Sequence, residues 1–219
     1  MAKKQIQYSR KWLLAQWLEI KWWKNYLRRQ NVATYLRNKK AYWQRILRQL
    51  QLEIPSNASI LDAGCGPAGI FTVLNQQSVY AIDPLLDKYT VELQHFDPSW
   101  YPQVRFYQER LEDLNLHEVF DFVFCLNAIN HVDDIELALK KLVAASRRGA
   151  KIIISTDAHK SKRLMKLFQL IPGDVLHPHQ FDLEKYQELF KKQGITIHTS
   201  IRLKQGRIFD YWIFIGEKV

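Results

Sequence analysis

Glycine residues gather at one point of the chain, where a short apolar run gives way to a turn. Three of the eight glycines, Gly64, Gly66 and Gly69, lie within six residues. Glycine permits a tight turn and lets the backbone approach a ligand closely. Asp83 ends the next apolar run, 21 positions after Asp62, and an acidic residue at such a place accepts hydrogen bonds from ribose hydroxyls. The spacing therefore predicts a site for an adenosine-containing cofactor.

The charge of the loop distinguishes two such cofactors. Residues 64–69 satisfy the dinucleotide pattern G-x-G-x-x-G, which is a weak signal when it stands alone. Asp62, two residues before the first glycine, would place a carboxylate under a pyrophosphate and repel it. S-Adenosylmethionine carries an ammonium and a sulfonium group and no phosphate. We therefore predict this methyl donor, with a nicotinamide dinucleotide, or a turn without any ligand, as the alternatives.

The chain also resembles a known family at these motifs. Residues 60–66, Ile-Leu-Asp-Ala-Gly-Cys-Gly, resemble the first motif of the class I, Rossmann-like S-adenosylmethionine-dependent methyltransferases. Residues 81–83 resemble their second, acidic motif, and residues 120–127 with His131-Val132 resemble their fourth strand and its continuation. The resemblance covers about residues 56–219. It implies an enzyme that transfers the methyl group of S-adenosylmethionine, and it says little about the acceptor.

The loop and the resemblance together assign the cofactor site. The residues expected there are Asp62, Ala63, Gly64, Gly66, Gly69, Asp83, Pro84, Leu111, Glu112 and Asn127. Asp62 and the glycines would bind the amino-acid part of the cofactor, and Asp83 its ribose. The family often has an adenine-contacting acid after the third strand, where this chain has Arg110. The adenine contact is therefore assigned to the Leu111 backbone or the Glu112 side chain, while Asn127 has the alternative role of finishing its strand through backbone bonds.

Histidines supply the candidates for a general base. Methyl transfer to a hydroxyl or a protonated amine is helped by a base, and histidine titrates near neutrality. The histidines that follow expected strands are His131, His159, His177 and His179, of which His159 and His179 are favoured. In the alternative interpretation each only bonds a loop or caps a helix. Asp157 with the last three could also bind a first-row metal, but His-Pro-His matches no common zinc pattern, and no metal site is predicted.

The basic charge of the chain lies almost entirely near its start. Residues 1–54 hold 13 basic and two acidic residues, a net charge of +11 against +10 for the whole chain, and five of the seven tryptophans. Three interpretations follow: a lid that covers the cofactor with Tyr42 and Trp43, a helix in an anionic membrane interface, or a surface that binds RNA phosphates. A merely solvated basic face would explain the charge equally well.

The cellular compartment of the protein is inferred from the lack of a membrane-spanning segment and of a secretion signal in the sequence. No apolar run approaches the roughly 18 residues that span a bilayer, and no secretion signal follows the first residues. The two cysteines, Cys65 and Cys125, form no metal-binding pattern. We predict a cytoplasmic protein in a reducing compartment, with contact at a membrane surface as an option.

The spacing of apolar residues predicts the helices and strands that carry these candidate residues. Residues 9–52 lack proline and glycine and predict two or three helices, with breaks near Asn31 and Asn38. Further helices are expected over 68–76, 86–95, 135–146 (closed by Gly149) and 183–192, and strands over 59–63, 79–82, 104–107, 120–126, 152–155, 195–201 and 208–215. The last two strands are joined by about six residues, too few for a parallel crossover, so they must be antiparallel.

The fold class that follows is α/β: a doubly wound, mostly parallel seven-stranded sheet with an antiparallel last strand, plus a helical N-terminal extension. The extension is residues 1–54, and the Rossmann-like domain is residues 55–219. The predicted function is methylation of a small-molecule or lipid-like acceptor at oxygen or nitrogen. The alternatives are an RNA methyltransferase that uses the basic helices and a binding module without catalysis. Residues 127–130, Asn-Ala-Ile-Asn, lack the Asn-Pro-Pro-aromatic pattern typical of enzymes that methylate nucleic-acid bases.

Overall fold

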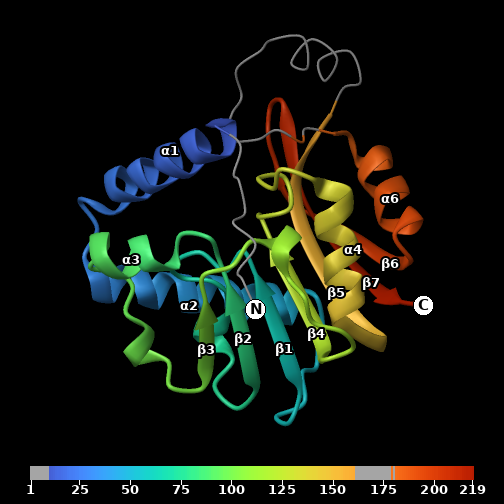
Figure 1. Cartoon of the computed structure of the whole chain (residues 1–219), viewed down its shortest axis with the longest axis horizontal. Coiled ribbons are helices and arrows are strands. Elements are labelled where there is room, and N and C mark those ends of the chain that lie inside the picture. Colours follow the sequence, from blue (N-terminus) through green and yellow to red (C-terminus); the bar gives the residue numbers. More distant parts are fainter. Residues whose placement is uncertain (1–9, 161–178, 180) are drawn as a thin grey trace, which may run out of the picture.

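The computed structural model describes residues 10–160, 179 and 181–219, and these residues form one seven-stranded sheet (Figure 1). Its strand order is β3-β2-β1-β4-β5-β7-β6. The strands are β1 Ser59–Ala63, β2 Ser78–Ile82, β3 Val104–Tyr107, β4 Phe120–Leu126, β5 Ser146–His159, β6 Ile195–Gln205 and β7 Phe209–Lys218. Six strands share one direction, and β7 runs antiparallel to both of its neighbours. The predicted fold class is confirmed.

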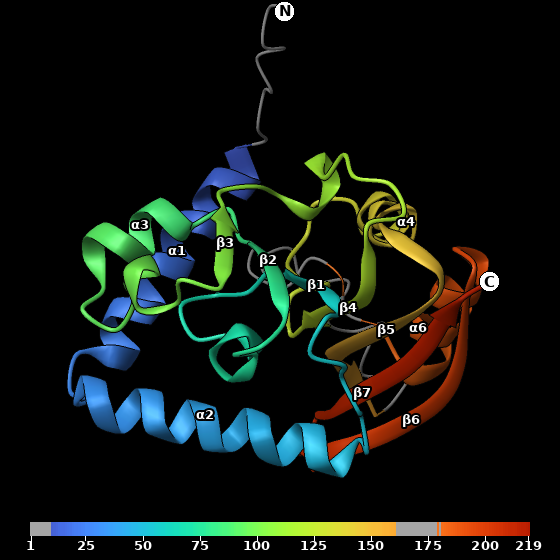
Figure 2. The same cartoon turned by 90° about the horizontal axis from the view of Figure 1, so that it is seen from below.

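Helices cover both faces of the sheet. They are α1 Arg10–Leu27, α2 Val32–Gln49, α3 Leu86–Glu92, α4 Ile135–Ala145 and α6 Leu183–Lys192. Alternate strand residues point to opposite faces: Ile60 and Phe124 join a buried cluster with α1, α2 and α3, whereas Leu61 and Val123 join another with α4 and α6. Figure 2 shows α2 and α4 on opposite sides of the sheet. The short continuous apolar strands are thus explained by burial on both faces.

The two N-terminal helices separate where one of the two expected breaks falls. Asn31 caps α2, and its side-chain oxygen accepts a hydrogen bond of 3.1 Å from the backbone N–H of Thr34. The break expected near Asn38 is wrong, because α2 continues through it. Asn38 is exposed, so its low helix propensity costs well under about 1 kcal/mol, while Trp43 and Ile46 hold the opposite side of the helix in the core.

The glycine loop leads into a shorter element than expected. Instead of a helix over 68–76, the structure has η1 Ile70–Val73, a 3₁₀ turn. The Thr72 hydroxyl donates to the Gly69 carbonyl oxygen over 2.9 Å, and bulky or β-branched residues at 70–73 favour helix weakly. Trp43 of α2 is buried against this loop, so α2 covers the face that a longer helix would have covered.

Other boundaries also differ from expectation: β6 extends to Gln205 and β7 to Lys218, beyond the expected ends at 201 and 215. α3 ends at Glu92, three residues early. β5 is much longer than 152–155, because β7 pairs with it from Lys151 to His159. β5 also begins earlier, at Ser146, so Gly149, expected to close α4, lies inside β5. None of the described helices is long and apolar enough to cross a membrane.

Candidate active site

A cavity of about 630 Å³ lies where β1, β2 and β4 end, between the glycine loop and the two N-terminal helices. Such a volume is typical of pockets for small molecules. In this strand order β1 is flanked by β2 on one side and by β4 on the other. The connection after β1 leads to one side of the sheet and the connection to β4 leads to the other, so the two diverge at the end of β1. Open α/β sheets bind ligands at that point.

Backbone geometry explains why the loop contains glycine. Gly64 and Gly66 have φ angles of +70° and +57°, a conformation that other residues avoid. A side chain on Gly64 would also overlap the methyl group of Ala128, which follows β4. The N–H groups of Gly64 and Cys65 both donate to the Ile82 carbonyl oxygen, over 2.8 and 3.0 Å. The loop is therefore held against the ends of two neighbouring strands.

Asp62 lies under this loop, almost fully buried at 2% exposure. Its Oδ2 accepts a hydrogen bond of 3.1 Å from the Phe71 N–H, and a Cβ on Gly69 would come within 2.6 Å of the same oxygen. Burial raises the pKa of Asp62 to about 7, although the bond from Phe71 lowers it in part. Only the four-residue 3₁₀ turn η1 follows the loop, so a pyrophosphate would find no strong helix dipole there.

Asp83 lies at the end of β2 and faces the cavity. Its Oδ2 accepts a 2.9 Å hydrogen bond from the N–H of Gly66, and its Oδ1 accepts a 2.8 Å bond from the N–H of Leu85. Burial raises the pKa of Asp83 to about 6, against the lowering effect of these two bonds. The carboxylate is thus fixed in orientation beside the loop, at the place expected to hold a ribose.

Most of the residues assigned to the cofactor come together around the cavity. Those that line it are Gly64, Gly66, Gly69, Asp83, Pro84, Leu111, Glu112 and Asn127, whereas Asp62 and Ala63 lie behind the lining. Asn127 has a φ of +56°, and its N–H donates to the carbonyl oxygen of Ser155 over 2.9 Å. The individual cofactor contacts of these residues stay predictions.

Glu112 neutralises the arginine that replaces the expected adenine-contacting acid. Its Oε1 accepts bonds from the Arg110 guanidinium at 2.9 Å and from the Asp133 N–H at 2.7 Å. Arg110 also lies with its guanidinium carbon 4.9 Å from the centroid of the Trp12 ring. One oxygen of Glu112 is therefore committed to the loop after β3 and to the segment before α4, which leaves Oε2 for a ligand.

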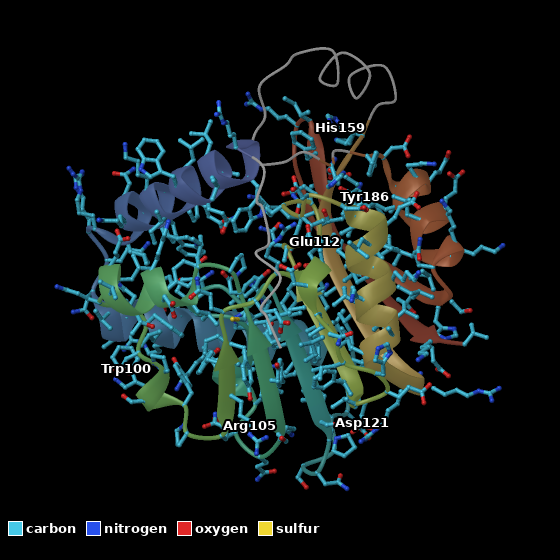
Figure 3. All side chains as sticks on the ribbon, in the orientation of Figure 1. Trp100, Arg105, Glu112, Asp121, His159 and Tyr186 are labelled. Carbon is cyan, nitrogen blue, oxygen red and sulfur yellow. The ribbon has the colours of Figure 1, made fainter. Side chains whose placement is uncertain are left out.

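The described histidines do not gather as expected. His131 lines the cavity. His159 is only 4% exposed, its ring lies 4.3 Å from the ring of Phe209, and Figure 3 places it apart from Glu112 towards the end of β5. The Nε2 of His179 lies 3.2 Å from the Asp133 carbonyl oxygen, and neither His159 nor His179 is among the lining residues. His177 lies outside the described residues.

The alternative of a metal site finds no support in the described part of the chain. No group of three or more histidine, cysteine or acidic side chains is placed there to hold an ion. Asp157 lines the cavity and His159 does not. Both cysteines are buried as free thiols, and burial raises the pKa of each.

Several lining residues were not assigned to the site from the sequence. They are Trp12, Gln16, Glu19, Trp22 and Trp23 of α1, Lys39 of α2, and Asp157, Lys204 and Tyr211 of the sheet. Positions 12, 16, 19 and 23 follow helical spacing, so a wheel of α1 would have placed them on one face. Tyr42 and Trp43, predicted to cover the cofactor, do line the cavity. The Tyr211 hydroxyl lies 2.6 Å from the Ser155 hydroxyl.

Comparison with known proteins agrees with this geometry. Residues 35–200 match a family model described as "Methyltransferase domain". The chain belongs to this family, within the class I, Rossmann-like group, and it is an S-adenosylmethionine-dependent methyltransferase. The predicted cofactor and enzyme class are confirmed.

Two relatives and one structure illustrate the similarity. The chain is 28% identical over 162 residues to a ubiquinone biosynthesis O-methyltransferase of Rickettsia felis, covering 71% of this chain and 66% of that protein. It is 26% identical over 190 residues to the Rickettsia typhi protein of the same name, covering 75% of each. The chain thus spans slightly less than two thirds of the first relative.

The solved structure is the 1,6-didemethyltoxoflavin-N1-methyltransferase of Burkholderia thailandensis with bound 1,6-didemethyltoxoflavin and S-adenosylhomocysteine. Its TM-score is 0.63 at 19% identity, covering 100% of this chain and 93% of that one. At this identity the likeness shows the fold alone. The relatives are named for oxygen and this neighbour for nitrogen as the methylated atom, so the fold does not determine the acceptor.

Proposed function

We propose that the protein methylates a hydroxyl oxygen of a small, lipid-like acceptor, with His131 as the general base. The observation that carries this proposal is the position of His131, which lines the cavity beyond the end of β4. The name shared by the two Rickettsia relatives supports oxygen as the methylated atom. The alternatives are nitrogen methylation, RNA as the acceptor, and binding without turnover, and the test below distinguishes the last two from the proposal.

The chemistry needs alignment, a proton acceptor and the exclusion of water. S-Adenosylmethionine supplies an electrophilic methyl group. The attacking oxygen forms a bond to the methyl carbon as the carbon–sulfur bond breaks, and the sulfur keeps that electron pair. His131 would accept the hydroxyl proton. Trp22, Trp43 and Val132 supply apolar lining that limits water around the reacting groups.

The first 54 residues act, in this proposal, as a lid that also contacts anionic lipid. Leu13, Leu14, Trp17 and Trp22 of α1 are 46–52% exposed, although they are large and apolar. The Lys21 Nζ lies 3.7 Å from the centroid of the Trp17 ring, so charge and apolar surface occur together as they do in interfacial helices. Trp22 also lines the cavity, which would let a lipid-like acceptor enter from the membrane side.

The test begins with radiolabelled methyl donor and a whole-cell extract that is separated into lipid, RNA, protein and small-molecule fractions. We expect label in the lipid or small-molecule fraction. Label in RNA that disappears at high salt would replace this proposal with RNA methylation. Cofactor binding without label in any fraction would identify a binding module.

The membrane contact has its own measurement, which is co-sedimentation with anionic lipid vesicles. Trp17→Glu should weaken vesicle binding at least fivefold, because it puts a charge on the apolar face of α1. Leu137→Glu is the matched control, since Leu137 is 37% exposed on α4, on the other face of the sheet. Equal binding by the two variants would contradict the membrane contact without affecting the methyltransferase chemistry.

A further inference from the structure

One face of α1 is turned towards the glycine loop, with two polar residues between tryptophans. Trp12, Gln16, Glu19 and Trp23 all line the cavity. A Cβ built on Gly66 would lie 3.8 Å from the Cζ2 atom of Trp23, so α1 passes directly over the loop. The side chains of this face therefore reach the space where the amino-acid and ribose parts of the cofactor are expected.

Gln16 has an unsatisfied hydrogen-bond acceptor at this position. Its side chain is 6% exposed, and its Oε1 accepts no hydrogen bond from the described residues. A buried amide oxygen without a donor destabilises the cofactor-free protein, because its desolvation is not compensated. The cavity is the direction from which a donor can come, and S-adenosylmethionine offers an ammonium group, ribose hydroxyls and an adenine amino group.

Glu19, one turn further along α1, adds a carboxylate opposite Asp83. Both side chains line the cavity, and the described basic side chains form no ion pair with either of them. Burial, and then the negative charge of Asp83, raise the pKa of Glu19 to about 8, while hydrogen bonds with Trp23 and Tyr89 lower it. In the cofactor-free protein Glu19 is therefore largely protonated at neutral pH, and a cation that binds beside it favours the ionised form. Lys39, Arg110 and Lys204 also line the cavity, but among the described side chains none of them forms an ion pair with Glu19 or Asp83. Two carboxyl groups that face one cavity without an ion-pair partner suit a positively charged ligand.

We propose that α1 is part of the cofactor site, with Gln16 as a hydrogen-bond acceptor for S-adenosylmethionine and Glu19 as a countercharge that acts together with Asp83. Methyl transfer converts the charged sulfonium into the neutral thioether of S-adenosylhomocysteine. Glu19 therefore makes the site bind the methyl donor more tightly than the product. The affinity of the site falls when the methyl group has been transferred, which favours release of the product. The inference depends on the cofactor and not on the identity of the acceptor.

The test compares the affinities of both ligands by isothermal titration calorimetry. Gln16→Leu removes the acceptor at similar size, and it should weaken both ligands by about 5- to 50-fold. Glu19→Gln keeps the shape and removes the charge. It should weaken S-adenosylmethionine about tenfold and S-adenosylhomocysteine less than about threefold. Glu19→Asp, which retains the charge, should keep most of the preference for the methyl donor.

Glu92→Gln is the control for the docking of α1. Lys24 of α1 and Glu92 of α3 form an ion pair of 2.9 Å, so this variant loosens α1 without changing the charge that faces the cavity. It should affect both ligands equally. If Glu19→Gln also affects both ligands equally, or neither, while circular dichroism shows a folded protein, the role of Glu19 is overturned. If the unaltered protein binds neither ligand, the cofactor assignment itself fails.

Discussion

The indole N–H of Trp43 donates a hydrogen bond of 2.9 Å to the carbonyl oxygen of Ala68. This bond joins α2 to the glycine loop across 25 positions of the chain. It is buried, and Trp43 belongs to the same hydrophobic cluster as β1 and β4. The loop is therefore supported from one side by strand ends and from the other by a helix that precedes the sheet.

Removing this bond should loosen the loop. Trp43→Phe keeps most of the apolar volume and leaves the buried Ala68 carbonyl without its donor, at a cost of about 1–3 kcal/mol in the free energy of unfolding. We expect weaker binding of S-adenosylmethionine as well. Urea denaturation and calorimetry measure the two effects. Trp100→Phe is the control, because Trp100 is 45% exposed, and equal losses in the two variants would contradict a specific role for the bond.

The close approach of Gly64 to Ala128 gives a sharper stability prediction. Gly64→Ala meets both a positive φ and an overlap with the Ala128 methyl group. Gly194→Ala meets a φ of +83° alone, with nothing within 4 Å. The strain costs roughly 1–2 kcal/mol, and the overlap adds about 1–3 kcal/mol. The first variant should therefore be clearly less stable to urea, and Ala128→Gly should restore part of the difference. Equal stability of the two single variants would rule out the overlap.

The buried carboxyl of Asp62 makes folding depend on pH. Its pKa is raised by burial to about 7, whereas an unfolded aspartate titrates near 4. Between those values the folded protein binds more protons than the unfolded chain, so stability falls as pH rises from about 4 to 7. Asp62→Asn should flatten this slope, measured by urea denaturation of the cofactor-free protein at a series of pH values.

Asp121 is the matched control for that measurement. It is partly exposed near the start of β4, and despite some desolvation its pKa is lowered by bonds from Ser59 and Arg147. The stability that it contributes is therefore lost only when pH falls below about 4. Asp121→Asn should leave the slope between pH 5 and 8 as it is. A slope that Asp62→Asn does not change would show that other groups control it.

The role of His131 is tested by kinetics once an acceptor is identified. His131→Ala should lower kcat by roughly 10²- to 10⁴-fold, since a positioned base contributes that much. The affinity for S-adenosylmethionine should change little. His159→Ala and His179→Ala serve as comparisons, because neither side chain lines the cavity. A larger loss in either of them would move the base to that residue.

The sheet and the glycine loop were predictable because their signals are local. Apolar runs end at Asp62 and Asp83, and the glycines with positive φ stand where a turn requires them. The helix expected after the loop was wrong, because α2 covers that face, and a packing partner 25 residues away has no local signal. The face of α1 over the cavity follows helical spacing, but only the docked structure shows what it faces.

His159 lies away from the lining of the cavity for a geometric reason. The register pairs Leu126 of β4 with Ser155 of β5, and β5 continues to His159. Four further residues at about 3.3 Å each carry His159 about 13 Å past the end of β4. β7 pairs with β5 from Lys151 to His159 and so determines where β5 ends. The apolar run alone did not predict this length of β5.

The tight fit of Gly64 against Ala128 divides the site into parts with different freedom to change. At Gly64 the floor of the cavity has no room for even one extra methyl group, so new specificities cannot arise at that position. The opposite side of the cavity, its roof, is built from side chains of α1, α2 and the β6–β7 hairpin. Replacing these side chains leaves the ends of β1, β2 and β4 unchanged. Engineering of this enzyme towards other acceptors should therefore randomise roof positions such as Trp22, Lys39, Lys204 and Tyr211 and keep the floor constant.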